Sequence, residues 1–355
     1  MRVLVVNAGS SSLKLRLVGA DDELLGSSDL EPGDDVEAAL AGLGEAEASG
    51  HRVVHGGARF VDPVVIDDAV VAALEELTAL APLHQPPALA AIAAVRRAAP
   101  QLPAVACFDT AFHAGLPDAA ATYALPRSWR ARWPLRRYGF HGLSHAWAAR
   151  RAAERLGGAR RIVICHLGAG ASLAAVLDGR SVDTTMGFTP LAGLVMATRP
   201  GDVDPGLLMW LLEQTDLTQA EVAAALVHES GLQGLAGTTD MRDVLAAAAA
   251  GEPAAVLALD VYLHRLRAGI AAMAAALGDL DALVFTGRVG ERAHEVRSRA
   301  AAGLGFLGVG LDDAANAAAA GDADIGAPGA RVRALVVESR EDLEIARAVR
   351  AALGT

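Results

Sequence analysis

Two stretches decide the fold: Arg2-Val-Leu-Val-Val-Asn7-Ala-Gly-Ser-Ser-Ser-Leu-Lys14 and Arg161-Ile-Val-Ile-Cys-His166-Leu-Gly-Ala-Gly-Ala-Ser-Leu173. Each begins with a continuous apolar run, which is typical of a strand buried on both faces. In both copies a loop of small residues, a second strand, a turn and a third strand follow in the same order, with Asp178-Gly179 as the second turn. The repeat predicts two similar domains that face a cleft.

The rest of the chain alternates strand and helix patterns, which predicts α/β layers. Strands are expected at 13–18, 104–108, 173–177, 181–184, 283–285 and 334–337, and helices at 67–80, 88–98, 144–156, 218–227 and 253–277. Ser144 is expected to cap its helix, Thr218 and Glu221 form a capping box, and Ser339 with Asp342 is expected to open a last helix in the same way.

Composition excludes several classes of protein. A chain of 355 residues suits two domains, and 53% hydrophobic with 21% charged residues excludes a disordered or collagen-like chain. The net charge of −11, without a basic block, argues against a general nucleic-acid binder. The longest uncharged stretch, 78–95, holds three prolines and is a poor membrane span, and Met1-Arg2 leads straight into a strand, so no signal peptide is expected. Cys107 and Cys165 lie in strand-like runs, which predicts buried thiols in a reducing cytosol.

The first repeated stretch carries the rarest side chains of the sequence. Lys14 is the one lysine among 31 lysines and arginines, and Asn7 is one of two asparagines. An ammonium is a compact point charge, so a site at this loop could require it, although one exposed lysine without a role is the alternative. Small residues let the backbone approach an oxyanion, so the loop resembles a phosphate cradle, whereas a plain hairpin is the commoner meaning of such a turn.

Four further segments place chemistry at strand ends and turns: His51-Arg52-Val-Val-His55-Gly-Gly57, Phe108-Asp109-Thr-Ala-Phe-His113, Arg137-Tyr-Gly-Phe-His141-Gly-Leu-Ser-His145 and Thr198-Arg199-Pro-Gly-Asp-Val-Asp-Pro205. Arginine can hold a carboxylate or phosphate bidentately, and active sites of open sheets collect at strand ends. Each segment alone is more often structural, since an arginine and an acid in a loop commonly form a surface ion pair.

Together these motifs resemble the acetate kinase family of carboxylate kinases, within the actin/hexokinase-like (ASKHA) superfold. The resemblance runs from Asn7 almost to the end of the chain and includes Phe285 to Glu291 and Glu341 to Ala346. It implies an α/β fold of two duplicated domains with a central cleft. The first domain would span 1–140, completed by a helix at 341–355, and the second 141–340 with most of the nucleotide site.

The resemblance also implies an activity, namely reversible phosphoryl transfer from ATP to acetate that gives acetyl phosphate and ADP. It implies Mg²⁺, with Mn²⁺ as a substitute, a cytoplasmic homodimer, and neither a nucleic-acid nor a membrane partner. The catalytic residues would be Asp109, His141, Arg199 and Arg52, and the metal positions Asn7 and Glu341. Acetate would bind at Arg52, Val54, Leu83, Phe140 and Pro190. Nucleotide would bind at Lys14, His166, Leu167, Gly168, Ala169, Gly170, Asp240, Met241, Arg242, Arg288, Val289, Gly290, Glu291 and Arg292.

Elementary chemistry bears on these roles. Acetate is already ionised at pH 7 and needs no general base. Asp109 is therefore expected to act by holding metal-bound water or by orienting an arginine and Mg²⁺, not by abstracting a proton. For Glu341, a simpler reading is an acid favoured at a helix N-terminus.

Several positions depart from the family pattern. The pattern has Asn at Ala169, Gly at Arg288, Asn at Arg292 and Glu at Asp342, and the chain is shorter between Lys14 and His51. Three of these changes fall in the nucleotide subsite. Alternatives to an acetate kinase are therefore a propionate or butyrate kinase, a phosphotransferase of this fold with another phosphoryl donor, and a non-catalytic nucleotide-sensing module.

Overall fold

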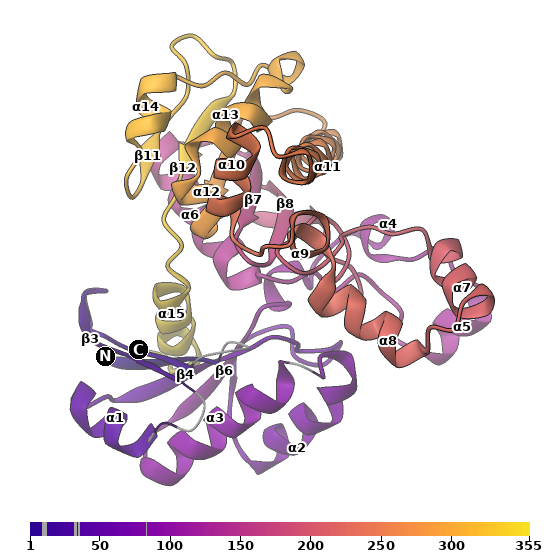
Figure 1. Ribbon diagram of the computed structural model, residues 1–355. Coiled ribbons are helices and arrows are strands. Elements are labelled where there is room, and N and C mark those ends of the chain that lie inside the picture. The colour runs from indigo at the N-terminus through magenta and orange to yellow at the C-terminus, as the bar shows by residue number, and fades with distance from the viewer. Residues whose placement is uncertain (9–12, 32–33, 35, 83) are drawn as a thin grey trace. The chain divides into compact units, whose positions relative to one another are not determined.

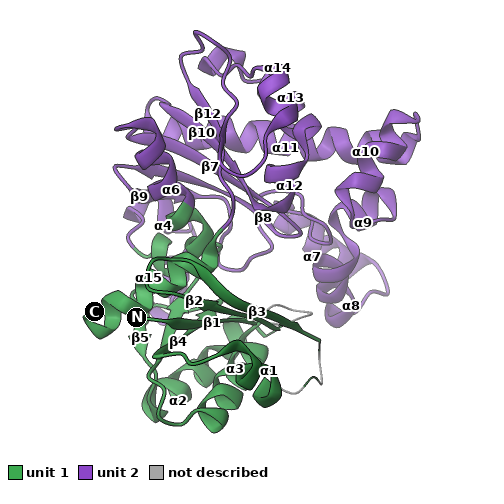
Figure 2. Ribbon diagram, turned by 90° about the vertical axis from the view of Figure 1, so that its left-hand side faces the viewer, with its two compact units in different colours: residues 1–114, 140–147, 340–355 green, residues 115–139, 148–339 purple. Residues whose placement is uncertain are grey.

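The computed structural model describes residues 1–8, 13–31, 34, 36–82 and 84–355 (Figure 1). The chain divides into two compact units, coloured separately in Figure 2. Unit 1 comprises 1–114, 140–147 and 340–355, and unit 2 comprises 115–139 and 148–339. Residues 115–139 pack with unit 2 because Arg137 donates to the carbonyls of Thr185 and Met186. The division into functional domains at 140 and 340 stays a prediction.

Unit 1 is built on a six-stranded sheet in the order β3-β2-β1-β4-β6-β5. Its strands are β1 (Val3–Ala8), β2 (Leu13–Val18), β3 (Leu24–Leu30), β4 (Ala48–Val53), β5 (Val64–Val65) and β6 (Ala104–Phe108). Its helices are α1 (Val36–Leu43), α2 (Asp68–Glu76), α3 (Gln85–Ala98) and α15 (Glu341–Leu353), with 3₁₀ turns at Leu77–Leu80 and Ala111–His113. Strands β1, β4 and β6 are parallel, and β2, β3 and β5 join antiparallel.

Strand β1 is apolar from Val3 to Val6 because helices cover both faces of the sheet. Val3 and Val5 pack in a cluster with Ile345 of α15, whereas Leu4 and Val6 pack in a cluster with residues of α3. The continuous apolar run of the sequence therefore has its predicted meaning of a strand buried on both sides.

Unit 2 repeats this sheet in the order β11-β12-β10-β7-β8-β9. Its strands are β7 (Arg161–Leu167), β8 (Ala171–Leu177), β9 (Arg180–Thr184), β10 (Ala282–Thr286), β11 (Ala323–Asp324) and β12 (Arg333–Val336). Read from the opposite edge, the order and every pairing direction match unit 1 strand for strand. The predicted duplication and the α/β fold class are confirmed.

Unit 2 also contains the following helices. They are α4 (Asp118–Ala121), α5 (Arg127–Arg132), α7 (Pro205–Gln214), α8 (Gln219–Ala224), α9 (Gly231–Ala236), α10 (Met241–Ala249), α11 (Pro253–Leu277), α12 (Gly287–Arg292), α13 (His294–Ala302) and α14 (Asp313–Ala318). Helix α6 (Gly142–Leu156) begins in unit 1 and continues in unit 2, a π-helical turn follows α8 at Ala225–Glu229, and a 3₁₀ turn spans Gly305–Leu307. No single described helix has the length and apolar composition of a membrane span, although the bent pair Gly231–Ala249 and Pro253–Leu277 passes that test together.

Helix ends correct two of the expectations. Ser144 does not cap α6: the helix already begins at Gly142, whose N–H donates to the Asp109 carbonyl, and Ser144 is buried inside it. The expected capping box at Ser339 is also wrong, because Arg340 occupies the N-cap of α15 and makes no side-chain cap bond. The box of Thr218 and Glu221 is confirmed.

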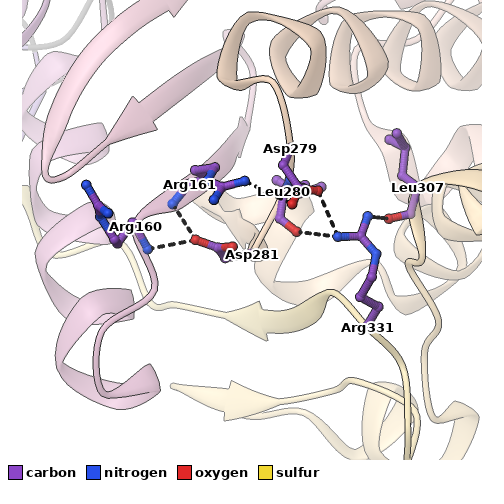
Figure 3. A network of polar contacts seen from close by, with 7 residues as sticks. All are labelled: Arg160, Arg161, Asp279, Leu280, Asp281, Leu307 and Arg331. Atoms are coloured by element: carbon purple, nitrogen blue, oxygen red, sulfur yellow. Dashed lines mark hydrogen bonds and ion pairs between the residues drawn. The ribbon is translucent and has the colours of Figure 1, made fainter.

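The amino ends of the parallel strands in unit 2 are held by a network of ion pairs and hydrogen bonds (Figure 3). The Asp281 carboxylate accepts from the backbone N–H groups of Arg160 and Arg161, at 3.0 and 2.8 Å. Asp279 pairs with Arg161 and Arg331. This network fixes the start of β7 beside the start of β10, at the amino ends of these two strands.

Candidate active site

Three neighbouring parallel strands of unit 1 end in polar side chains. Asn7 lies near the end of β1, Arg52 near the end of β4, and Asp109 directly after β6. The register pairs Val6 with His51 and Arg52 with Cys107, and the Asp109 N–H donates to the Val53 carbonyl at 3.0 Å. The three side chains thus start from one level of one sheet edge, where ligands of open α/β sheets bind.

The Arg52 guanidinium joins these side chains in one network. Its Nη2 lies 2.5 Å from Asp109 Oδ2 and its Nε 3.2 Å from Oδ1, a bidentate contact. Its Nη1 donates to Asn7 Oδ1 at 3.2 Å. Glu341, the first residue of α15, accepts from Asn7 Nδ2 at 3.2 Å and lies 3.9 Å from Arg52 Nε. Four residues far apart in the sequence therefore form one cluster.

The cluster is largely withdrawn from water. Asp109 is 1% exposed, whereas the side chains of Arg52 and Glu341 keep about a sixth of their surface, 16% and 17%. Burial opposes the charged guanidinium, but the carboxylates of Asp109 and Glu341 outweigh it, so the pKa of Arg52 lies above its usual value. Burial raises the pKa of Asp109, and Glu341 adds to the rise against the attraction of Arg52. The site thus concentrates one permanent cation and two carboxylates at low dielectric.

His141 is held beside this cluster by the backbone. Its φ of +56° is a left-handed conformation uncommon for a non-glycine residue, and Gly142 follows it. A Cβ at Gly142 would lie 2.1 Å from the Asp109 carbonyl oxygen, so the close approach requires glycine. Strained backbone of this kind collects at functional sites.

Apolar residues border the same part of unit 1. Val54 is 5% and Phe140 1% exposed, and the Phe140 ring packs edge-on against His55 with centroids 5.4 Å apart. Lys14 is exposed on β2 directly opposite Asn7 in the register. Leu83 and the loop 9–12 lie outside the described residues.

A cavity of about 340 Å³ opens in unit 2. Its walls come from the loop after β7, from α9, α10 and α11, and from α12: Gly168, Ala169, Ala197, Leu232, Thr239, Asp240, Met241, Arg242, Leu245, Tyr262, Arg288, Val289, Arg292 and Ala293. Most of these side chains are apolar, and three are arginines. The Arg242 guanidinium and backbone N–H bind the Asp240 carboxylate and lower its pKa to about 2, so Asp240 stays ionised.

Eight of the predicted nucleotide residues line this one cavity, namely Gly168, Ala169, Asp240, Met241, Arg242, Arg288, Val289 and Arg292. The other six of that set do not line it, namely Lys14 of unit 1 and His166, Leu167, Gly170, Gly290 and Glu291. Glu291 instead accepts from the Ser339 N–H at 2.9 Å. The reasoning from sequence missed Leu232, Leu245 and Tyr262, because apolar residues of helices carry the same pattern whether they line a cavity or a core.

Arg199 and Pro190, the remaining predicted residues, lie together in unit 2. Arg199 Nη1 donates to the Pro190 carbonyl at 2.7 Å, and burial lowers the pKa of Arg199. Gly231, with a φ of +63°, packs against the Arg199 backbone, where a Cβ would approach the Arg199 carbonyl to 2.7 Å.

Comparisons with known proteins identify the family of the chain. The model of the acetokinase family matches residues 35–347. The acetate kinase of Clavibacter michiganensis subsp. michiganensis is 48% identical over 97% of both chains. Among solved structures, Porphyromonas gingivalis acetate kinase has a TM-score of 0.91 at 34% identity and covers 99% of both chains, and a propionate kinase from Francisella tularensis subsp. tularensis has a TM-score of 0.92 at 35% identity, covering 98% of both. The chain belongs to the acetokinase family.

Proposed function

We propose that this protein is an acetate kinase, which transfers the terminal phosphoryl group of ATP to acetate and gives acetyl phosphate and ADP, reversibly. The observation that carries the proposal is the buried cluster of Arg52, Asp109, Asn7 and Glu341 at the carboxyl edge of the first sheet. Phosphoryl transfer needs positioning and charge neutralisation more than covalent help from the protein. A cation held at low dielectric beside oxygen ligands supplies both.

In the proposed reaction, an acetate oxygen attacks the terminal phosphorus in line. The new P–O bond forms as the bond to the bridging oxygen of ADP breaks, and no proton has to move because acetate is ionised. Arg52 stabilises the charge on the equatorial oxygens, and His141 and Arg199 are proposed to add to it. Asp109 is a positioning residue, because its two oxygens fix the Arg52 guanidinium.

The same cluster fits a magnesium ion. Mg²⁺ takes oxygen ligands, uses one or two carboxylates, and completes its shell with water and substrate phosphates. Glu341 and Asn7 offer such oxygens with Asp109 nearby, although no group of three or more metal-binding His, Cys, Asp or Glu side chains occurs in the described part of the chain. A bound ion would neutralise phosphate charge. Mn²⁺, which prefers the same ligands, is expected to substitute.

We propose that the cavity of unit 2 binds the nucleotide. Its volume falls in the range of small-molecule sites, its apolar walls suit a base, and Arg242, Arg288 and Arg292 suit a polyphosphate. Ala169 has no side-chain amide to offer there, so base preference is the property most open to change in this chain.

The decisive experiment is a hydroxamate assay with acetate, propionate and butyrate, each with ATP, GTP or pyrophosphate as donor. We expect turnover with Mg²⁺ and ATP and a preference for acetate, and the same assay with Mn²⁺ tests the substitute metal. One methylene in a pocket is worth about 1–3 kcal/mol, so a shifted acceptor preference would be visible. Turnover with pyrophosphate alone would show that pyrophosphate, and not ATP, is the phosphoryl donor. If the protein bound ADP but gave no turnover, the result would favour a nucleotide sensor.

We also propose a homodimer in the cytoplasm. Two helices of unit 2 expose large apolar side chains, among them Trp129 of α5 and Met209 and Trp210 of α7, all about half exposed. Large exposed apolar side chains are candidates for an interaction surface. Light scattering should give twice the chain mass, and Trp210→Asp should give monomers, whereas Leu257→Asp on α11 should not. The cytoplasm is proposed because Cys107 and Cys165 are free, buried thiols.

A further inference from the structure

Arg297 on α13 is a fully buried arginine of unit 2. It is 1% exposed and heads the largest fully buried side chains of the described chain. Burial lowers the pKa of Arg297, yet a guanidinium stays charged in proteins. A buried charge is costly unless it is fully hydrogen-bonded, so its partners carry information.

All four contacts of this guanidinium are to neutral oxygens. It donates to Asn316 Oδ1 and to the Asn316 carbonyl at 2.7 Å, and to the carbonyls of Gly290 and Glu291 at 2.8 Å. The Asn316 amide in turn donates to the His294 carbonyl and to Ser298 Oγ. Arg297 is therefore bound to helices on both sides of α13, which contacts α12 and α14 (Figure 1).

The two backbone carbonyls belong to the last turn of α12. A helix of six residues has few internal hydrogen bonds, and its last carbonyls have no partner within the helix. A cation at this end satisfies them and interacts favourably with the helix dipole. The other end of α12 is equally constrained, because Gly287 has a φ of +75° and a Cβ there would lie 2.8 Å from the Leu167 carbonyl.

Helix α12 supplies one wall of the cavity through Arg288, Val289 and Arg292, whereas Arg297 does not line it. We propose that Arg297 is a positioning residue for the nucleotide site. Its hydrogen bonds to the end of α12 hold this helix in place, so that Arg288 and Arg292 reach the cavity. The inference rests on the proposed function of that cavity, and it names a residue that acts on affinity without touching the ligand.

The test is Arg297→Met, with Arg299→Met as the matched control on the exposed side of the same helix. We expect the Kd for ADP, measured by calorimetry, to rise about tenfold or more, with the KM for acetate changed less than about twofold. Arg297→Lys keeps the charge but reaches fewer oxygens, so it should fall between. A merely structural role would instead lower thermal stability and leave the affinity of the folded molecules unchanged, which would overturn the proposal.

Hydrogen exchange in the ligand-free protein separates this inference from the proposed function. Arg297→Met should speed exchange in 287–292 more than in the rest of unit 2, and Arg299→Met should not. If the unsubstituted chain failed to bind ADP, the proposed function would fall while the exchange result still decided the role of Arg297. If Arg297→Met does not fold, Asn316→Ala removes the Oδ1 contact and takes its place, and unchanged exchange at α12 overturns the proposal.

Discussion

The two sheets share strand order and pairing direction, but their carboxyl edges carry different chemistry. In unit 1 the three parallel strands end in Asn7, Arg52 and Asp109, which form a buried charged cluster. In unit 2 the equivalent strands β7 and β10 end near His166 and Thr286, beside a cavity with mostly apolar walls. The difference shows that the fold fixes where a site can form, and that the side chains at the strand ends decide what it does.

The units also bury different polar groups. The buried histidines of the described chain, His51, His55, His113 and His145, all lie in unit 1, whereas unit 2 buries the Arg297 guanidinium. A buried imidazole can be neutral, but a buried guanidinium cannot. Acid should therefore act on the two units unequally.

Breaking the charged cluster should have the largest effect. Arg52→Met leaves Asp109 buried without its cation, so we expect the free energy of unfolding to fall by about 3–5 kcal/mol and turnover to fall about a thousandfold or more. Urea titration and the hydroxamate assay measure the two. The control is Arg96→Met, which removes an exposed pair with Asp68 and should cost less than about 1 kcal/mol.

A double variant sharpens this result. Arg52→Met with Asp109→Leu replaces the pair by apolar groups, so stability should recover while turnover stays lost. Recovery of turnover would contradict a catalytic role of Arg52.

Acid should destabilise unit 1 before unit 2. Burial lowers the pKa of His51 to about 3 and of His55 and His113 to about 4, from an ordinary 6.5. The unfolded chain binds protons below pH 6.5 that the folded chain cannot bind, so stability is full above 6.5, falls as the pH drops, and levels off below about 4 for His55 and His113. Each of these histidines should lower the free energy of unfolding by about 1 kcal/mol as the pH falls from 6.5 to 5.5.

The measurement is hydrogen-exchange protection in urea at both pH values, corrected for intrinsic rates. Peptides from β4 should lose protection, and peptides from β7 should not. Equal losses in the two units would contradict the assignment of the acid effect to these histidines.

Crowding the contact between β4 and α15 should have a smaller effect. A Cβ at Gly50 would lie 2.5 Å from Ile345 Cγ2 and 2.6 Å from Val349 Cγ2, so Gly50→Ala should cost about 1–3 kcal/mol. Gly42 in α1 has no atom within 4 Å of its Cβ position, and Gly42→Ala should stabilise unit 1 by about 0.5–1 kcal/mol. Thermal denaturation compares the two variants, and their changes in stability must have opposite signs.

The smallest effect is expected at the amino ends of the parallel strands in unit 2. Asp281→Asn weakens the acceptor of the Arg160 and Arg161 N–H groups (Figure 3), which should cost about 1 kcal/mol in unfolding and leave turnover unchanged. A loss of turnover larger than the loss of folded protein would show that this edge is coupled to the site.

The two repeated strands could be predicted because burial on both faces leaves a continuous apolar run. Strand β4, which carries Arg52, could not be recognised in this way. Its sequence Ala-Ser-Gly-His-Arg-Val is polar, yet Ser49 and His51 are buried because Ser49 Oγ lies 3.1 Å from His51 Nε2. A strand whose polar side chains contact one another inside the core cannot be recognised from its hydropathy.

The motifs indicated Arg52, Asp109, Asn7 and Glu341 as site residues, and these do converge. The lining of the cavity was harder to predict from the sequence. Three separate helices, α9, α10 and α11, bring Leu232, Leu245 and Tyr262 to it. Nothing local to those residues distinguishes them from core positions. Only the tertiary arrangement gives them a ligand-facing surface.

Helix α15 has a consequence for how the protein is made. It is the last helix of the chain, and it covers the face of the first sheet formed by Val3, Val5 and Val105. During synthesis these valines leave the ribosome more than two hundred residues before Ile345 and Val349, so the nascent chain carries a bare apolar sheet face while unit 2 is still being translated. Chaperones should therefore bind the new chain until α15 has been synthesised and packs on this face.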